Sequence, residues 1–512
     1  MKPWVRDWVA YHAARRPEAP ALTCVERGLT LSWEDLERRV GRLAQVLRHE
    51  FGLAPGDRVA MLAENDTRVF ELQFACMRAG LIFVPLSWRL SVGEIVALAK
   101  DAEPAVLFYD ETWRRMGDEI ADASGIGRRV LWSDEVAESP YDRLIDAAAS
   151  AMEGGVQDED AITHILYTSG TTGLPKGALC SQGTLKHHAI NSAQTSRTSE
   201  RGGHHLNIVP LFHAGGLNTF SNPTLYWGGH VTTVRRFDPE TALRLLTDPA
   251  LGVTHLCGVL QMYELITALP AFAEARFPTL RTGLFGGWGP KTVWVHQAWQ
   301  ARGVFLQLAY GSTEQGPNVS VLEGGRELAL VNCSGFVAPG TDLRLVGPNG
   351  ADVAQGEVGE IWTRGPAITP GYWRRPREDY FTGDWFRTGD CGRLDAAGRL
   401  YIVDRLREVY RSGGENVYPA EVELVLSSAP GVREVAVIAF PDDRWGEVGM
   451  AIVERAPGSQ VTLDSLLSHA EGKLARFKLP RHFATVDVMP RNATLKIDRA
   501  ALKKVFGGAA AV

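Results

Sequence analysis

The segment of this sequence that points most directly to chemistry is the loop 168–177, which reads TSGTTGLPKG. It holds four hydroxyl side chains, three glycines and one lysine in ten residues. Glycines let backbone N–H groups approach a ligand closely, hydroxyls donate hydrogen bonds, and Lys176 adds a positive charge. This composition suits a loop that holds a polyphosphate. The alternative is a flexible Ser/Thr/Gly linker that binds nothing.

The loop does not match the P-loop of kinase-like ATPases. When the GxxxxGK[ST] pattern is started at Gly170, Pro175 stands where the second glycine belongs, and Gly177 stands where serine or threonine should follow the lysine. We therefore expect a phosphate site of a different kind.

The elements that must position this loop alternate between helix and strand, as in an α/β protein. The run ITHILYT (162–168) predicts a buried strand directly before the loop. Earlier in the chain, a helical pattern at 32–51 alternates with β-rich runs at 57–64 and 81–86, which favours a mostly parallel sheet. Helices are also predicted at 4–12, 419–429 and 463–477, and a surface connection at 136–160.

A chain of 512 residues exceeds one ordinary core, so at least two domains are expected. The charged run DRLRE (404–408) separates a long α/β region from about a hundred residues with helices and strands of their own. This predicts a large domain over 1–403, a small domain over 404–512 and a hinge near 404–408.

Composition excludes several classes of function. The net charge of −6 and the absence of a basic run argue against a nucleic-acid surface. No apolar run is long enough to span a bilayer, and Arg6 and Asp7 interrupt any signal-peptide core. The six cysteines lie far apart without a metal-binding pattern, which fits a reducing cytoplasm. Small molecules are the expected partners, and a homodimer is left open.

Six motifs together resemble one family. YTSGTTGLPKGA is similar to the signature of the adenylate-forming superfamily, which comprises acyl-CoA synthetases, peptide synthetase adenylation domains and beetle luciferases. The resemblance continues in order through VPLFHAGG (209–216), YGSTE (310–314), FRTGD (386–390), VDRLREVYRSGGENVYPAEVE (403–423) and MPRNATLKIDR (489–499). It covers essentially the whole chain.

The resemblance implies an α/β fold with a large N-terminal domain of layered subdomains and a small mobile α+β C-terminal domain. It also implies an ATP-dependent acyl-CoA ligase that uses ATP, Mg²⁺ and coenzyme A. A carboxylic acid would become acyl-AMP with release of pyrophosphate, and a CoA thioester would then form with release of AMP. The alternatives are transfer to a carrier-protein thiol, an amine or another nucleophile, and a non-catalytic nucleotide-binding protein.

The resemblance assigns residues to each part of the site. Lys496, Glu314 and His213 are the implied catalytic residues, and Thr168 and Glu314 the implied metal ligands, since Mg²⁺ prefers oxygen ligands. Asp390 would accept hydrogen bonds from ribose hydroxyls. The implied ATP/AMP-binding set is Thr168, Ser169, Gly170, Thr171, Thr172, Gly173, Lys176, Gly287, Trp288, Tyr310, Gly311, Ser312, Thr313, Glu314, Asp390, Arg405 and Lys496.

The same resemblance assigns Ser412, Gly413 and Gly414 to coenzyme A. The implied acyl pocket, mostly apolar and suited to a fatty or aryl acid, consists of Phe212, His213, Asn218, Phe285, Gly286, Trp288 and Leu308. No arginine or lysine is among them, which disfavours dicarboxylic acids.

Three positions depart from the family pattern. Leu495 precedes Lys496 where the family usually has glycine, and Arg407 stands where aspartate or lysine is usual. Trp288 replaces a small residue, so that it either narrows the pocket or points into the core.

Overall fold

The predicted strands before the phosphate loop build a six-stranded sheet. The computed structural model describes residues 4–134, 139–168, 175–200, 202–287, 291–322, 330, 333–492 and 496–507. The strands run in the order β10 (Lys176–Ser181), β9 (Ile162–Thr168), β5 (Ile82–Pro85), β4 (Arg58–Leu62), β6 (Val106–Asp110) and β7 (Arg128–Trp132). All neighbours are parallel except β9 and β10, which confirms the mostly parallel sheet and the strand at 162–168.

Capped amphipathic helices accompany this sheet. In α2 (Trp33–Gln45), Ser32 and Asp35 form a capping box, and the apolar face buries Trp33, Leu36 and Val40. The other helices of this part are α3 (Thr67–Ala79), α4 (Val92–Ala102), α5 (Arg114–Ser124), α6 (Pro140–Ala147) and α7 (Gln182–Ser196).

A second, larger sheet continues the N-terminal domain. Its parallel part is β2 (Pro20–Cys24), β12 (His230–Thr233), β11 (His204–Asn207), β13 (His255–Val259), β14 (Thr282–Gly286) and β15 (Leu306–Ser312), with β3 (Leu29–Ser32) antiparallel at the edge. The antiparallel continuation is β16 (Gly316–Leu322), β17 (Cys333–Val337), β22 (Leu400–Arg405), β21 (Trp385–Leu394), β19 (Gly359–Arg364) and β18 (Asp342–Val346). Helices α10 (Pro239–Thr247), α11 (Leu260–Thr267) and α12 (Thr292–Gln300) accompany its parallel part.

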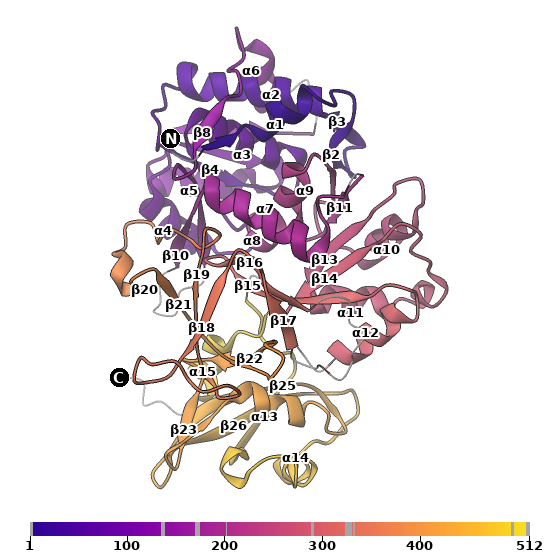
Figure 1. Cartoon of the computed structure of the whole chain (residues 1–512), viewed down its shortest axis with the longest axis vertical. Helices are drawn as coiled ribbons and strands as arrows, with labels where there is room; N and C mark the ends of the chain where they lie inside the picture. The colour runs from indigo at the N-terminus through magenta and orange to yellow at the C-terminus, as the bar shows by residue number, and fades with distance from the viewer. Residues whose placement is uncertain are drawn as a thin grey trace.

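The C-terminal residues form a small α+β unit that lies below the large one in Figure 1. Its sheet contains β23 (Tyr410–Ser412), β24 (Glu415–Val417), β25 (Val432–Asp442), β26 (Gly446–Arg455) and β27 (His482–Val486), and its helices are α13 (Pro419–Leu426), α14 (Leu463–Ala470) and α15 (Arg499–Phe506). It has its own apolar cores. The expected fold class, a large α/β part with a small α+β part, is confirmed.

Two sequence-based expectations near the N-terminus are wrong. Residues 4–12 are not one helix, because β1 (Trp4–Arg6) pairs with β8 (Val156–Asp158), and Asp7 then caps the short helix α1 (Trp8–Ala13) by accepting the Ala10 N–H. The segment 136–160 is not a plain connection, since it contributes α6 and β8.

The helix predicted at 463–477 is shorter than expected. It ends at Ala470 as α14, and Gly472 follows with a φ of +71°, a left-handed conformation that ends helices. A 3₁₀ turn, Arg476–Lys478, completes the segment.

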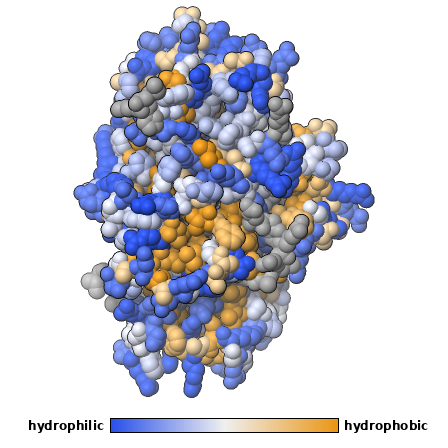
Figure 2. All heavy atoms as spheres, viewed as in Figure 1, coloured by the Kyte–Doolittle hydropathy of each residue, from blue (hydrophilic) through white to orange (hydrophobic). Residues whose placement is uncertain are grey.

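None of the described helices is long and apolar enough to cross a membrane. Apolar side chains are nevertheless visible in the middle of the face shown in Figure 2, in the region where β16–β18 lie in Figure 1, while mostly polar ones surround them. One apolar side chain of these strands, Phe336 on β17, is 55% exposed.

Candidate active site

Sheet register brings the two predicted ribose residues together. On neighbouring strands β21 and β22, Asp390 lies directly opposite Arg405, and their side chains form an ion pair of 3.2 Å. Tyr310, at the end of β15, donates its hydroxyl to the other carboxylate oxygen at 2.8 Å. Burial raises the pKa of Asp390, and the neighbouring Arg405 and the Tyr310 hydrogen bond oppose this rise.

Glu314 lies at the meeting point of the phosphate loop and a later segment. Its Oε1 accepts hydrogen bonds from Thr168 at 3.3 Å and from the Tyr372 hydroxyl at 2.8 Å. The Glu314 carbonyl accepts the backbone N–H of Thr369. The predicted metal ligands Thr168 and Glu314 are thus in contact, and residues 369–372 hold the glutamate from the far side.

Lys176 stands beside two tyrosine rings. Its Nζ lies 4.4 Å from the ring centre of Tyr380 and 5.6 Å from that of Tyr372. Cation–π contacts of this kind position an ammonium without neutralising it. The charge of Lys176 therefore stays available for an anion at the start of β10.

The imidazole of His213 is neutral and oriented. Its Nδ1 accepts the N–H of Gly215 at 2.9 Å, so the proton of the neutral ring is on Nε2. Burial, with repulsion from Lys496 and Arg89, lowers the pKa of His213 to about 4. His213 thus presents an N–H donor at neutral pH.

Lys496 of the small unit reaches the large unit. Its loop is closed on itself, since Asn492 Oδ1 accepts the N–H of Lys496 and Asn492 donates its own N–H to the Lys496 carbonyl. Although the residue retains solvent contact, desolvation of the ammonium and repulsion from Arg405 lower its pKa, opposed by attraction to Asp390. The electrostatic neighbours of Lys496 are therefore Asp390, Arg405 and His213.

The other predicted nucleotide residues line the turn between β15 and β16 and the end of β14. Gly311 leaves no room for a side chain, because a Cβ there would lie 2.3 Å from the Gly316 carbonyl oxygen. Gly287 is exposed with a φ of +88°, which favours glycine. Ser312 accepts the Gln315 N–H, and Thr313 is buried.

The structure divides the predicted acyl-pocket residues. Phe285 and Leu308 belong to a core cluster, with Phe285 packed on Tyr263 at 5.5 Å. Because side chains alternate across a strand, their neighbours Leu284 and Ala309 face the opposite side. We therefore remove Phe285 and Leu308 from the pocket.

Phe212 is also buried, and its ring packs edge-on against Trp88 at 6.0 Å. Asn218, in the turn η3 (Leu217–Ser221), stays a candidate. It is 1% exposed and its Oδ1 accepts a hydrogen bond from Asn222, while its Nδ2 has no hydrogen-bond partner among the described residues. A buried amide N–H without a partner is costly, so this group favours a ligand or water as acceptor. Gly286, at the end of β14, is half-buried.

The predicted coenzyme A residues lie on the small unit, in the hairpin of β23 and β24. Gly413 and Gly414 have φ values of +62° and +91°, and a Cβ on Gly413 would lie 2.7 Å from the Trp445 ring. Ser412 is buried. In Figure 1 the strand β23 lies in the lower part of the small unit. The contact of these residues with coenzyme A stays a prediction.

Several predicted residues lie outside the described part of the chain: Ser169, Gly170, Thr171, Thr172, Gly173, Trp288 and Leu495. The two alternatives for Trp288, that it narrows the pocket or that it points into the core, therefore both stay open.

Sequence reasoning missed three residues of the site. Tyr372 donates its hydroxyl to Glu314, and Tyr372 and Tyr380 both flank Lys176. Gln315 links the Tyr310 hydroxyl at 3.1 Å to Thr363 at 3.1 Å. The position of Gln315 directly after Glu314 was the available signal. Nothing local marks Tyr372, which is placed by its bridge to Ala178 of β10.

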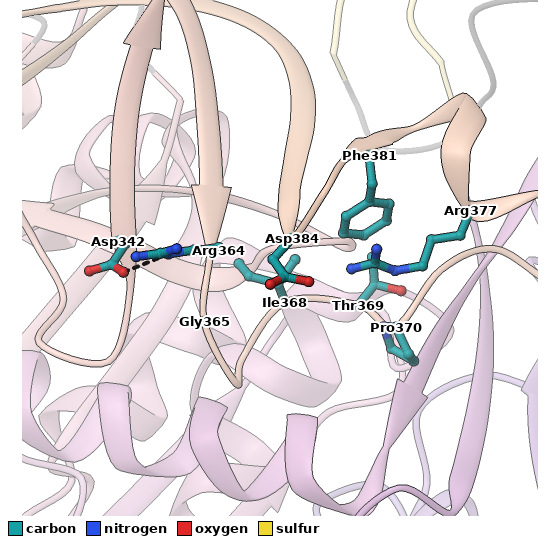
Figure 3. A pocket seen from close by; sticks show the side chains of 9 residues that line it. All are labelled: Asp342, Arg364, Gly365, Ile368, Thr369, Pro370, Arg377, Phe381 and Asp384. Carbon is teal, nitrogen blue, oxygen red and sulfur yellow. Dashed lines mark hydrogen bonds and ion pairs between the residues drawn. The ribbon is translucent and has the colours of Figure 1, made fainter. Parts of the chain in front are cut away.

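A surface pocket of about 340 Å³ lies behind the segment that holds Glu314 (Figure 3). Ile368, Thr369 and Pro370 contribute to its wall, and the ion pair Arg364–Asp342 lies at one side. Its lining contains none of the predicted site residues, so it is separate from the predicted acyl pocket.

The oxygen groups around Glu314 fit a magnesium ion. Mg²⁺ is commonly bound by one or two carboxylates together with substrate phosphates. Glu314 offers a carboxylate and Thr168 a hydroxyl next to the phosphate loop. No group of three or more His, Cys, Asp or Glu metal ligands occurs in the described ranges.

Comparison with known proteins agrees with this geometry. A family model described as AMP-binding enzyme matches residues 9–373, and one described as AMP-binding enzyme C-terminal domain matches residues 421–496. The chain is 37% identical over 504 residues to a feruloyl-CoA synthase of Amycolatopsis sp, covering 98% of this chain and 99% of that protein. It is 35% identical over 495 residues to an indoleacetate–CoA ligase of Aromatoleum aromaticum, covering 96% of each.

Solved structures show the same architecture. ATP-bound MatB from Rhodopseudomonas palustris superposes with a TM-score of 0.88 at 28% identity, over 98% of this chain and 99% of that one. The apo structure of MatB superposes over the same shares with a TM-score of 0.79 at 29% identity.

The chain belongs to the AMP-binding enzyme family, the adenylate-forming superfamily that its motifs resemble. Its reaction is that of an ATP-dependent, AMP-forming acyl-CoA ligase, with ATP, Mg²⁺ and coenzyme A as participants.

Proposed function

We propose that this ligase activates an aromatic carboxylic acid, of the arylalkenoic or arylacetic type. The relatives with 37% and 35% identity are named for ferulate and indoleacetate, two acids whose aromatic ring systems carry polar groups that can form hydrogen bonds. Asn218 supports the same class, because its buried Nδ2 lacks a hydrogen-bond partner in the part of the chain that the structure describes. This group suits a polar substituent at the end of an otherwise apolar acid.

The observation that carries the catalytic assignment is the position of Lys496. A lysine of the small unit has Asp390 and Arg405 of the nucleotide site and the imidazole of His213 as its electrostatic neighbours. An ammonium placed there stabilises the negative charge that develops when a carboxylate attacks the α-phosphate. We assign the observed orientation of the two units to adenylation, and the better fit to ATP-bound than to apo MatB supports this.

The other site residues bind and orient the nucleotide and the acid in this proposal. Asp390, held by Tyr310 and Arg405, accepts the ribose hydroxyls. Lys176 and the phosphate loop hold the phosphates, and the Nε2–H of His213 donates to the acid's carboxylate. Thr168 and Glu314 would hold Mg²⁺, which neutralises charge on the phosphates when bound.

The thiol step requires a second orientation. The predicted coenzyme A residues Ser412, Gly413 and Gly414 belong to the small unit, and a rotation about 404–408 would bring them to the site in place of Lys496. The two moving bodies are the large unit and the small unit, and the predicted boundary between 1–403 and 404–512 lies next to the pivot. We also propose a cytoplasmic location, in line with six free, buried cysteines.

Pyrophosphate release tests the function. The protein would be assayed with ATP, Mg²⁺ and a panel of ferulate, indoleacetate, octanoate and malonate, with and without coenzyme A, and product masses would be read out. We expect release and a CoA thioester with the aromatic acids at least tenfold faster than with the other two. Release without a thioester would move the proposal to another acceptor, and a preference for octanoate or malonate would overturn the substrate class.

A further inference from the structure

The chain stays tied to the large unit up to Leu406. Asp404 pairs with Cys391 and Arg405 with Asp390 in the β21–β22 ladder, and the N–H of Leu406 donates to the Gly389 carbonyl at 2.8 Å. The sheet of the small unit begins at Tyr410 with β23. Any rotation between the units is therefore absorbed by residues 407–409, and Asp404 lies on the large-unit side of this pivot.

The carboxylate of Asp404 nevertheless bonds to the small unit. Its Oδ2 accepts the backbone N–H of Ala420 at 2.8 Å, while its Oδ1 accepts the N–H of Arg405 at 2.7 Å. Ala420 is the second residue of α13, and the residue before the helix, Tyr418, makes no side-chain cap. Pro419 has no N–H, so Ala420 offers the first free donor of the helix. Asp404 thus supplies from the large unit the cap that α13 lacks.

One ion pair connects the capped helix to the helix that follows the catalytic loop. Glu423 of α13 pairs with Arg499 at 2.7 Å, and Arg499 also donates to the carbonyl of Val437 at 2.8 Å. Arg499 is the first residue of α15 and follows Lys496 by three positions. The position of α13 against β22 is therefore transmitted to Lys496 through side chains of one rigid unit.

We infer that Asp404 is a positioning residue for adenylation: its cap on α13 holds the small unit where Lys496 meets the nucleotide site, and the cap must break before the thiol step. This rests on the proposed function of the same site. The cap spans the pivot, so a rotation that carries α13 away separates Asp404 Oδ2 from the backbone nitrogen of Ala420. Loss of the cap then weakens one orientation without touching substrate or nucleotide.

Charges of opposite sign surround Asp404, which suits a hydrogen bond to Ala420 that forms in one orientation and breaks in the other. Arg499 of α15 attracts the carboxylate, whereas Glu423 of α13 repels it, and Cys391 and Tyr418 are its titratable neighbours. Burial raises the pKa of Asp404 to about 6, opposed first by the backbone N–H groups of Ala420 and Arg405. The carboxylate form that makes the strong cap is the main form at pH 7.5.

The two half-reactions give the first test. Acyl-adenylate formation and thioester formation from preformed acyl-adenylate would be measured separately for Asp404→Ala, with Asp404→Asn as the conservative variant that keeps an acceptor oxygen. We expect adenylation to fall about tenfold in Asp404→Ala, equivalent to about 1.4 kcal/mol, with a smaller loss in Asp404→Asn. Thioester formation should stay unchanged or rise. An equal loss in both half-reactions, or no loss in either, would overturn the inference.

A matched cap inside the small unit controls for stability. Thr462 caps α14 by accepting the Ser465 N–H at 3.2 Å, and both groups lie in the same unit. Thr462→Ala should lower the melting temperature and leave the ratio of the two half-reaction rates unchanged. The same shift of that ratio in Thr462→Ala and Asp404→Ala would reduce Asp404 to a structural cap.

A distance measurement separates this inference from failure of the proposed function. Spin labels would be placed at Glu119→Cys and Glu471→Cys, two exposed positions on the large and small units; the native cysteines are all buried. With ATP present, the wild-type background should show one dominant distance and Asp404→Ala should show a second. This readout needs no turnover. Identical distance distributions would contradict the role of Asp404, whatever the substrate.

Discussion

The ion pair between Asp390 and Arg405 should set the affinity for ATP in a pH-dependent way. In Arg405→Gln the buried Asp390 loses the group that most strongly opposes the rise of its pKa. The pKa of Asp390 should then rise further, so that protonation competes with its acceptance of ribose hydroxyls as the pH falls. We expect a higher KM for ATP, with a larger increase at pH 6 than at pH 8.5.

The magnitude follows from the 3.2 Å separation. Two unit charges at this distance attract by about 5 kcal/mol at an effective dielectric constant of about 20, and by about 1 kcal/mol in water. Asp390 is buried, but the Arg405 side chain is 49% exposed, so screening reduces the higher value. An attraction energy between these two values, about 2 kcal/mol, corresponds to about a 30-fold increase in the KM for ATP.

The assay is pyrophosphate release against ATP concentration at fixed saturating acid, repeated at pH 6, 7 and 8.5. Arg393→Gln is the matched control, because Arg393 lies on the same strand pair and packs over the ring of Tyr401 at 4.2 Å. Its KM should stay within about twofold of the wild-type value, well inside the roughly 1.4 kcal/mol that a tenfold change represents. An Arg405→Gln effect of equal size at all three pH values would refute the coupling to Asp390 and leave a direct nucleotide contact.

Three further predictions concern other parts of the molecule. Lys496→Ala should reduce adenylation by about 10²- to 10³-fold and spare thioester formation from preformed acyl-adenylate. The control Lys504→Ala, which changes an exposed lysine of α15, should alter neither step. Equal losses in both steps would contradict the role of Lys496. Because the pKa of His213 is lowered to about 4, the kcat/KM profile of the wild type should show no ionisation near pH 6.5 that disappears in His213→Phe. His204 and His230, whose rings stack at 4.0 Å, are neutral in the folded protein, because burial lowers their pKa values to about 4 and about 3. The unfolded chain therefore binds more protons than the folded one below pH 6.5. The free energy of unfolding should fall by about 2 kcal/mol per histidine between pH 6.5 and 5. Urea titrations of the wild type and of His204→Gln/His230→Asn would show this as a flatter pH dependence in the double variant, and parallel curves would exclude it.

Much of the nucleotide site could be predicted because its residues cluster in short motifs. A run of glycines and hydroxyls after a buried strand has few other uses, and Glu314, Asp390 and Lys496 each lie in a short recognisable motif. Phe285 and Leu308 show the limit of such reasoning. They lie on strands β14 and β15, which lead into the predicted site, but strand alternation turns their side chains into the core cluster of Tyr263.

The sequence by itself determined the reaction class and the α/β fold with its small second unit, and it predicted the reacting groups, because these depend on residue types within short segments. Only the tertiary structure decided which groups meet. The β21–β22 register places Arg405 opposite Asp390, a bridge to β10 brings Tyr372 onto Glu314, and Asp404 reaches α13 across the pivot. Such contacts join residues far apart in the chain, and burial then sets their charge states, as it does for His213. Neither register nor burial is encoded in any one motif, since both result from the packing of the whole chain.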